Sequence, residues 1–224
     1  MTDQQHPEPP DDDAPLDPAS MLALLQDQQD DVQRRMARFV PWILLSWAVA
    51  WGVGFGMLWL IDGARPQLAV PLEIAASVFA VLMVIAGVVS GVLGARSARG
   101  IRTSKAAAFT GAVYGMTWTV GFVALFVLGS ALSYNGMPSE LSNIYYPAIS
   151  LIFVGIMYII AGAIWHAIPA VVMGGLIVLI AAIGPYFGYP GHYLFYAITG
   201  SGVFLAGTVV TAVYSRKIHL KGLA

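Results

Sequence analysis

The sequence predicts an all-α fold: an integral membrane bundle of six transmembrane helices preceded by a cytoplasmic helix. Hydrophobic residues make up 58% of the 224 positions and charged residues only 10%, whereas soluble chains carry about 25% charged residues. Six apolar segments follow one another, each close to the ~20 residues that cross the hydrocarbon core of a bilayer. Basic residues concentrate in alternate connections between these segments, which is typical of a polytopic membrane protein.

The N-terminal region divides into an acidic tail and a helix. Residues 1–33 contain nine Asp and Glu and neither Lys nor Arg, and residues 1–17, rich in proline and poor in apolar side chains, are expected to be disordered. Asp17-Pro18 is typical of an N-cap followed by proline in the first turn, which predicts an amphipathic helix over 18–38. One face of this helix, at heptad a and d positions, is a candidate partner-binding surface. It comprises Leu22, Leu25, Val32 and Met36. A frayed, solvated helix is the alternative.

The transmembrane domain is expected over residues 39–214, followed by a basic cytoplasmic tail over 215–224. The six spans are predicted at 39–61, 71–93, 106–132, 144–164, 168–186 and 192–214. The fourth and fifth are nearly continuous, and one helix of their combined length would measure about 65 Å, too long for a bilayer. A tight helical hairpin with Pro169 in the first turn of the fifth span is therefore predicted, with a re-entrant pair as the alternative.

The orientation follows from the basic residues. With six spans, only Arg65 lies on one side of the membrane. The other side holds Arg34, Arg35, Arg38, Arg96, Arg99, Arg102, Lys105, Arg216, Lys217 and Lys221. Because basic loops face the cytoplasm, both termini are expected in the cytoplasm, with the chain in a plasma membrane.

The basic loop between the second and third spans is a candidate membrane-surface contact. Arg96, Arg99, Arg102 and Lys105 fall within ten residues, and such clusters attract anionic headgroups. Docking of the acidic tail or of a protein partner is the alternative. Nucleic acid is not an expected partner, because no fold that presents the charge to nucleic acid is evident.

Two predicted spans carry polar faces that are candidate cavity linings. In the third span these residues are Thr110, Tyr114 and Thr117, and in the sixth they are Tyr196 and Thr211, all spaced as one helical face. Hydroxyl groups in lipid need hydrogen-bond partners, so both faces are expected to point into the bundle. They either pack there or line a polar cavity, with Trp47, Trp51 and Trp118 as candidate neighbours.

Small residues four positions apart predict close helix packing. The pairs are Gly52–Gly56, Gly87–Gly91 and Gly111–Gly115, and such pairs let helix backbones approach one another in membranes. Packing within the bundle is the first interpretation and a dimer seam the alternative. Replacing Gly115 or Gly207 by Leu is expected to overpack a helix contact.

Residue patterns for catalysis, metals or cofactors are lacking, so neither an enzyme nor a cofactor is expected. The chain has no cysteine, which excludes disulfides and thiolate sites. His166 and His192 are expected at opposite membrane faces, too far apart to share a metal ion. Glu73 falls in the first turn of the second span, where a carboxylate suits the helix dipole; a substrate or proton site is the alternative.

The N-terminal helix and first span resemble a group of uncharacterised small polytopic membrane proteins of actinobacteria, some of which are labelled transporters. The matching stretches run from Asp17-Pro18 through Leu22 to Gln29, and from Ser46-Trp47 to Gly54. Asp30 stands where that group usually has a basic residue. The resemblance implies a similar count of helices and brings no functional residues.

Two functional hypotheses remain from the sequence. The first is a non-enzymatic plasma-membrane protein that acts through a partner, either a second copy or a cytoplasmic protein, as an accessory or sensory subunit. The second is a small permease or exporter subunit for an apolar or amphipathic compound, with the third and sixth spans lining its path. A membrane enzyme acting on lipid is disfavoured, because the chain offers no acid–base set.

Overall fold

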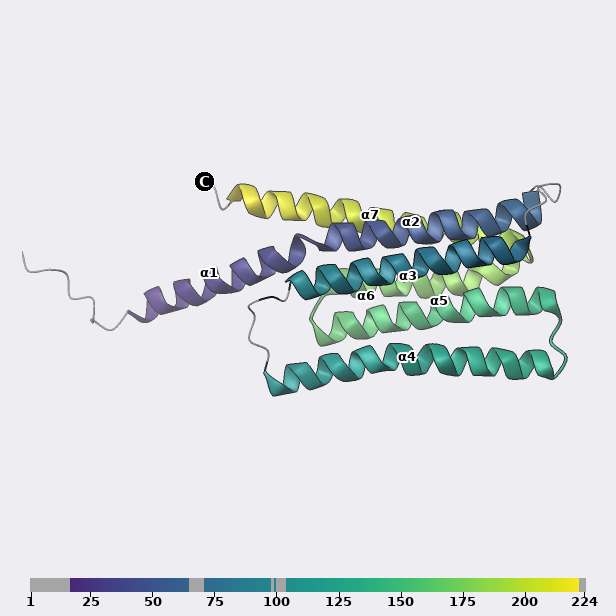
Figure 1. Cartoon of the computed structure of the whole chain (residues 1–224). Helices are drawn as coiled ribbons and strands as arrows, with labels where there is room; N and C mark the ends of the chain where they lie inside the picture. Colours follow the sequence, from purple (N-terminus) through teal and green to yellow (C-terminus); the bar gives the residue numbers. More distant parts are fainter. Residues whose placement is uncertain (1–16, 65–70, 98, 100–103, 222–224) are drawn as a thin grey trace, which may run out of the picture.

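The computed structural model describes residues 17–64, 71–97, 99 and 104–221, with the backbone alone at 27, 29–37, 62, 64, 72 and 214–221 (Figure 1). The helices are α1 (Pro18–Ala37), α2 (Val40–Trp59), α3 (Leu72–Ser97), α4 (Lys105–Tyr134), α5 (Ser139–Ile164), α6 (Ile168–Ile183) and α7 (Gly191–Lys221). A π-helical turn, η1 (Leu60–Ala64), extends α2, and a 3-10 turn, η2 (Gly184–Phe187), extends α6.

The all-α prediction is confirmed for the described part of the chain, which contains no strand. Six helices, α2 to α7, are long and apolar enough to span a bilayer, in the predicted number and order. Three expectations fall outside the described residues: the disordered acidic tail up to residue 16, the loop at Arg65 and the position of Arg102.

The break between α1 and α2 follows from a proline. Pro41 lies in the first turn of α2, and a proline clashes with the carbonyl group four residues before it. That carbonyl belongs to Ala37, the last residue of α1, and Arg38 and Phe39 form the turn between the helices. The helix is therefore interrupted just before Pro41, and α1 projects beyond the bundle (Figure 1).

The six spanning helices form an open arc. Extensive packing joins α3 to α2, α2 to α7, α7 to α6, α6 to α5, and α5 to α4. Although α3 and α4 are consecutive in the chain, they occupy the two ends of this arc. The end of the bundle where α2 and α4 begin and α3 ends is called the basic end below, because Arg38, Arg96 and Lys105 lie there (Figure 1).

The predicted hairpin between the fourth and fifth spans is confirmed. His166 adopts φ 53°, and the N–H of Ala167 donates to the carbonyl of Gly162 at 2.8 Å. This left-handed residue followed by a bond back into the last turn is the usual way to end a helix. Pro169 lies in the first turn of α6, as expected, so α5 and α6 run antiparallel and in close contact.

The core lies mainly where α2 crosses α7. Trp51 and Phe204 meet edge to face at 4.9 Å, and Trp51 meets Phe55 at 6.0 Å. Gly200 makes room for this cluster, because a Cβ atom there would lie 2.5 Å from Cε3 of Trp51. The aromatic rings of both helices therefore pack at this crossing, and a glycine provides the space where the Trp51 ring meets the α7 backbone.

Some predicted glycine contacts are wrong in this fold. A Cβ atom added at Gly87, Gly91, Gly111 or Gly115 would meet no atom within 4 Å. These pairs lie on the outer faces of α3 and α4, so they do not mediate packing within the bundle. The close contact through small residues instead joins α5 to α6, where a Cβ atom on Gly155 would lie 2.7 Å from the carbonyl oxygen of Gly174.

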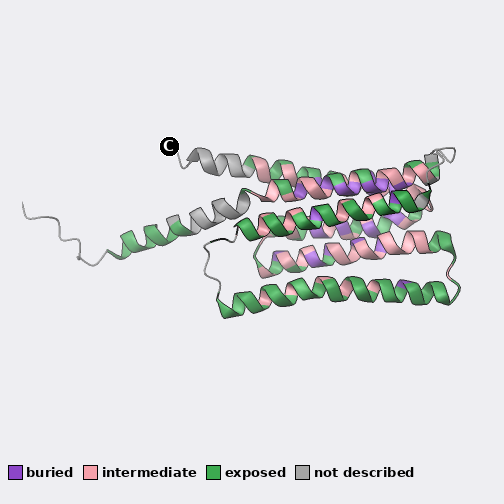
Figure 2. Ribbon diagram, in the orientation of Figure 1, coloured by how far each residue is buried: buried purple, intermediate pink, exposed green. Residues whose placement is uncertain are grey.

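The outward surface of the bundle is apolar. Figure 2 shows α4 exposed along nearly its whole length, with burial concentrated in α2, α5, α6 and α7. Exposed side chains on α4 include Phe109, Val120 and Phe126. Helices that present such side chains outward and satisfy their own backbone hydrogen bonds suit a hydrocarbon environment, which supports a multi-pass membrane protein.

Candidate functional site

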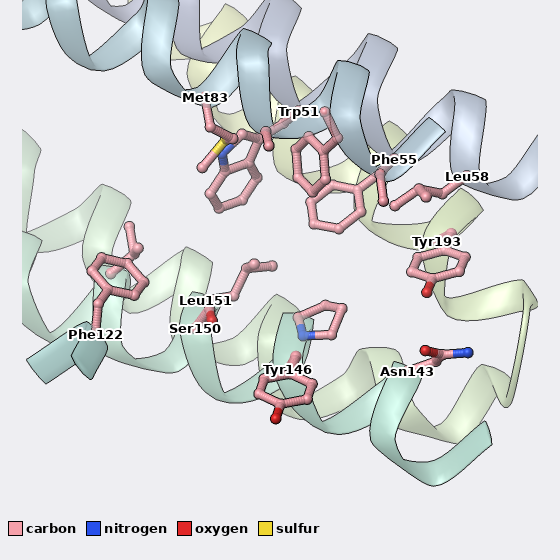
Figure 3. A pocket seen from close by; sticks show the side chains of 15 residues that line it. Trp51, Phe55, Leu58, Met83, Phe122, Asn143, Tyr146, Ser150, Leu151 and Tyr193 are labelled. Atoms are coloured by element: carbon pink, nitrogen blue, oxygen red, sulfur yellow. The ribbon is translucent and has the colours of Figure 1, made fainter. Parts of the chain in front are cut away.

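The inside of the arc holds a cleft, bounded by α2 and α3 on one side and α4 and α5 on the other (Figure 3). Its volume is about 400 Å³, within the ~300–1,000 Å³ range of small-molecule sites. Its lining includes Trp51, Phe55, Met83, Asn143, Ser150 and Tyr193. They run from the end opposite the basic end, where α5 begins, to about the middle of α2 and α3.

Aromatic packing fixes the α2 wall of the cleft. Trp51 is 1% exposed, and its indole ring projects into the space beside Met83 (Figure 3). Phe55 contacts Phe79 of α3 at 4.6 Å between ring centroids, and this pair packs α2 against α3. On α7, Phe204 packs against Trp51 and Tyr196 packs against Phe55, so both rings of this wall are also in contact with α7.

Within the described residues, two buried side-chain polar atoms lack a hydrogen-bond partner, and one of them belongs to this wall. They are Nε1 of Trp51 and the hydroxyl oxygen of Tyr145. Buried polar groups are paired in the great majority of cases, and an unpaired donor is more costly inside a membrane than near water. The N–H of Trp51 is therefore a buried donor within the wall that no side chain or backbone group of the described residues satisfies.

Polar groups gather at the outer part of the cleft, away from the basic end. Asn143 and Tyr146 of α5 lie there, and Tyr193 faces them from α7, whereas Ser150 lies deeper along α5, beside Leu151 (Figure 3). The remaining lining is almost wholly apolar. A space with a polar end and an apolar depth suits an amphipathic molecule that enters with its polar group outward.

A proline and a histidine together shape this polar end. Pro147 lies inside α5 and has no N–H, so the carbonyl of Asn143, four residues earlier, lacks its helical donor. Nε2 of His192 approaches that carbonyl oxygen at 3.1 Å. Nδ1 lies 3.2 Å from the carbonyl oxygen of Gly188, and a neutral ring can donate from only one of its two nitrogens. The Gly188 carbonyl already accepts from the backbone N–H of His192 at 2.9 Å, so we assign the donor to Nε2, which serves the Asn143 carbonyl. His192 is fully buried, and it fixes the start of α7 to the start of α5.

The expected polar face of the third predicted span, now α4, does not reach this cleft. Thr110, Tyr114 and Thr117 line a separate hollow of about 250 Å³ between α4 and α5. The Tyr114 hydroxyl donates to the carbonyl of Met157 at 3.2 Å. Both threonine hydroxyls donate to carbonyl groups one turn earlier in α4, so they need no partner from another helix.

The polar face of α7 lies apart from both hollows. Tyr196 is fully buried and donates to the carbonyl of Ala181 at 3.1 Å, while Thr211 donates to the carbonyl of Gly207 at 2.7 Å. The structure therefore does not bring the α4 and α7 residues together as one lining. Tyr193, one turn before Tyr196, is the α7 residue that does line the cleft.

The tryptophans named from the sequence have different places. Trp51 lines the cleft, as considered. Trp47 donates from Nε1 to the hydroxyl of Ser90 at 2.9 Å, which joins α2 to α3. Trp118 stacks against Phe122 and meets Phe153 edge to face, so it belongs to the contact between α4 and α5.

In the part of the chain that the structure describes, no three His, Cys, Asp or Glu side chains lie close enough together to hold a metal ion. His166 is exposed in the turn between α5 and α6 and His192 is buried near the opposite end. Glu73 is exposed in the first turn of α3.

The surface candidates are exposed where they are described. Leu22 and Leu25 of α1 are 58% and 62% exposed, whereas the side chains of Val32 and Met36 lie outside the described set. Arg96, Arg99 and Lys105 are also exposed, and Ser104 caps α4 by accepting from the N–H of Ala107 at 3.2 Å.

The sequence did not point to the polar residues of the cleft, which are Asn143, Tyr146, Ser150 and Tyr193. Asn143 carried a usable signal, because it lies four residues before a proline within a predicted span. The comparisons add no further candidate: no family model, curated protein or solved structure matches the chain.

Proposed function

We propose that this chain is a non-enzymatic accessory or sensory subunit of a bacterial plasma membrane, whose cleft binds an apolar or amphipathic molecule. The observation that carries the proposal is the 400 Å³ cleft, which is apolar along most of its length and has Asn143, Tyr146 and Tyr193 at one end. The positive-inside rule supports an orientation with the basic end and both termini in the cytoplasm. The cleft then lies in the outer half of the membrane.

A binding role is better supported than passage across the membrane. The lining residues end near mid-span, at Trp51, Met83 and Val154. A permease path would have to continue to the basic end, and the hollow between α4 and α5 toward that end shares no lining residue with the cleft. The permease hypothesis therefore has less support than ligand recognition.

The same helix connects the cleft to a second surface. Trp51 and Phe55 lie on α2, which follows α1 after a two-residue turn. Four exposed apolar side chains lie on the described part of α1: Met21, Leu22, Leu24 and Leu25. An acidic helix that exposes leucines is poorly suited to lie on an anionic membrane, so we propose that this face contacts a protein partner.

Ligand binding is tested with the purified full-length chain in maltoside micelles and radiolabelled C16 lysophosphatidylcholine as the probe. We expect saturable binding near one molecule per chain. Ala80→Trp, which fills the cleft from α3, should abolish it, whereas Ala124→Trp on the exposed face of α4 should not. Equal binding by both variants would refute the cleft as the site.

The α1 surface is tested separately. Leu22→Asp with Leu25→Asp should abolish cross-linking of α1 to its partner or to a second copy, while membrane insertion is unchanged. Unchanged cross-linking would show that the face is not a contact surface. Because these residues lie far from the cleft, lysophosphatidylcholine binding should be unaffected.

A further inference from the structure

A third hollow lies on the outside of the bundle, between α2 and α3 toward the basic end. Its volume is about 470 Å³. The lining runs along both helices and comprises Trp42, Leu45, Ser46, Val49, Ala50, Leu82, Ile85, Ala86, Val89 and Leu93. The hydroxyl of Ser46, the one polar side chain among them apart from the indole of Trp42, donates to the carbonyl of Ile43 in its own helix at 2.7 Å. The groove therefore offers hydrocarbon contact and little else.

The length of the groove matches one acyl chain. From Leu82 to Leu93 the α3 wall rises about 16 Å, which is close to half of the ~30 Å hydrocarbon core. Val49 and Ile85 on its walls are about half exposed, so the groove is open to the surrounding lipid. A chain lying in it would extend from mid-membrane to the surface at the basic end.

Cations flank the surface end of this groove. Arg38 lies one helical turn before Trp42, and Arg96 lies three residues after Leu93. Because α2 and α3 are antiparallel and packed together, both arginines are at the same end. Both are exposed, and the guanidinium of Arg38 lies 5.9 Å from the ring centroid of Phe39. Arg99 follows in the connection after α3 and is exposed as well.

We propose that this groove binds one anionic phospholipid, with an acyl chain along α2 and α3 and the phosphate between Arg38 and Arg96. Guanidinium groups pair with phosphate oxygens through parallel N–H donors. The carboxylates that begin spanning helices in the described part, Glu73 and Glu140, lie at the opposite end. A headgroup with net negative charge is therefore favoured over a zwitterionic one, and an acyl chain is needed to fill the groove.

The test uses native mass spectrometry of the full-length chain with dioleoylphosphatidylglycerol and dioleoylphosphatidylcholine at equal concentration. We expect one phosphatidylglycerol to be retained preferentially. Arg38→Gln with Arg96→Gln should weaken its binding about 30-fold, from about 1 kcal/mol for each base near the surface. Lys105→Gln, which removes a base at the same end but on α4, should leave it unchanged.

A second variant separates the groove from the charge. Val49→Trp fills the groove and keeps both arginines, so it should abolish the preference, while Val120→Trp on exposed α4 should not. Equal retention of the two lipids would show that the headgroup charge is not recognised and would overturn the site. A loss of phosphatidylglycerol in Lys105→Gln as large as that in the double arginine variant would show attraction by overall charge and would overturn it as well. Unchanged retention of phosphatidylglycerol by Val49→Trp would overturn the site too. So would a dimer of the chain that Val49→Trp alone dissociates, because the groove would then be occupied by a second copy.

Discussion

The contact between His192 and the carbonyl of Asn143 has a measurable consequence. His192→Phe keeps a ring of similar size in a fully buried position and removes the donor that approaches the carbonyl at 3.1 Å. Leaving a buried acceptor unpaired costs about 1–3 kcal/mol. For a chain of this length, each kcal/mol lowers the midpoint of thermal unfolding by about 2–4 °C.

A second substitution tests the cause of that loss. Pro147→Ala restores an N–H four residues after Asn143, so the helix itself can pair the carbonyl. His192→Phe should then cost less than half as much in the Pro147→Ala background. The four proteins of this double-mutant cycle are compared by thermal unfolding in one detergent. If the two substitutions are additive, the orphaned carbonyl is not what His192 stabilises.

Two further predictions concern packing and topology. Gly155→Ala should destabilise the bundle by about 1–3 kcal/mol, because the new methyl group meets the backbone of α6. The control, Gly115→Ala, adds a methyl group that meets nothing within 4 Å and should be neutral. Equal shifts in the midpoint of thermal unfolding would contradict the assigned helix contacts. Reporter fusions after Lys105, Glu140 and His166 should report inside, outside and inside, with the C-terminus inside; an outward report at His166 would contradict the proposed orientation of the hairpin.

The fold could be predicted because hydrocarbon thickness fixes the length of each span. The six segments and the hairpin at Pro169 follow from apolar length and one proline. The break before Pro41 follows in the same way, since the clash with Ala37 is local. None of these features depends on which helices become neighbours.

The cleft could not be predicted, because it depends on the order of helices around the arc. Apolar walls such as Phe79 and Met83 have the same composition as surfaces that face lipid. The expectation that polar faces point into the bundle is wrong for Thr117, because a threonine hydroxyl can donate to the carbonyl one turn earlier in its own helix. Likewise, Gly111 and Gly155 look alike in sequence, and only the presence of a facing helix separates them.

The central claim, a ligand in the cleft, is tested most directly by protection of a cysteine placed there. The native chain has no cysteine, so Ser150→Cys carries a single thiol within the cleft, and Ser130→Cys carries one on the exposed face of α4. We predict that C16 lysophosphatidylcholine slows modification of Ser150→Cys by a lipid-soluble maleimide in a saturable manner and leaves Ser130→Cys unaffected. Equal slowing of both variants, or of neither, would contradict the account.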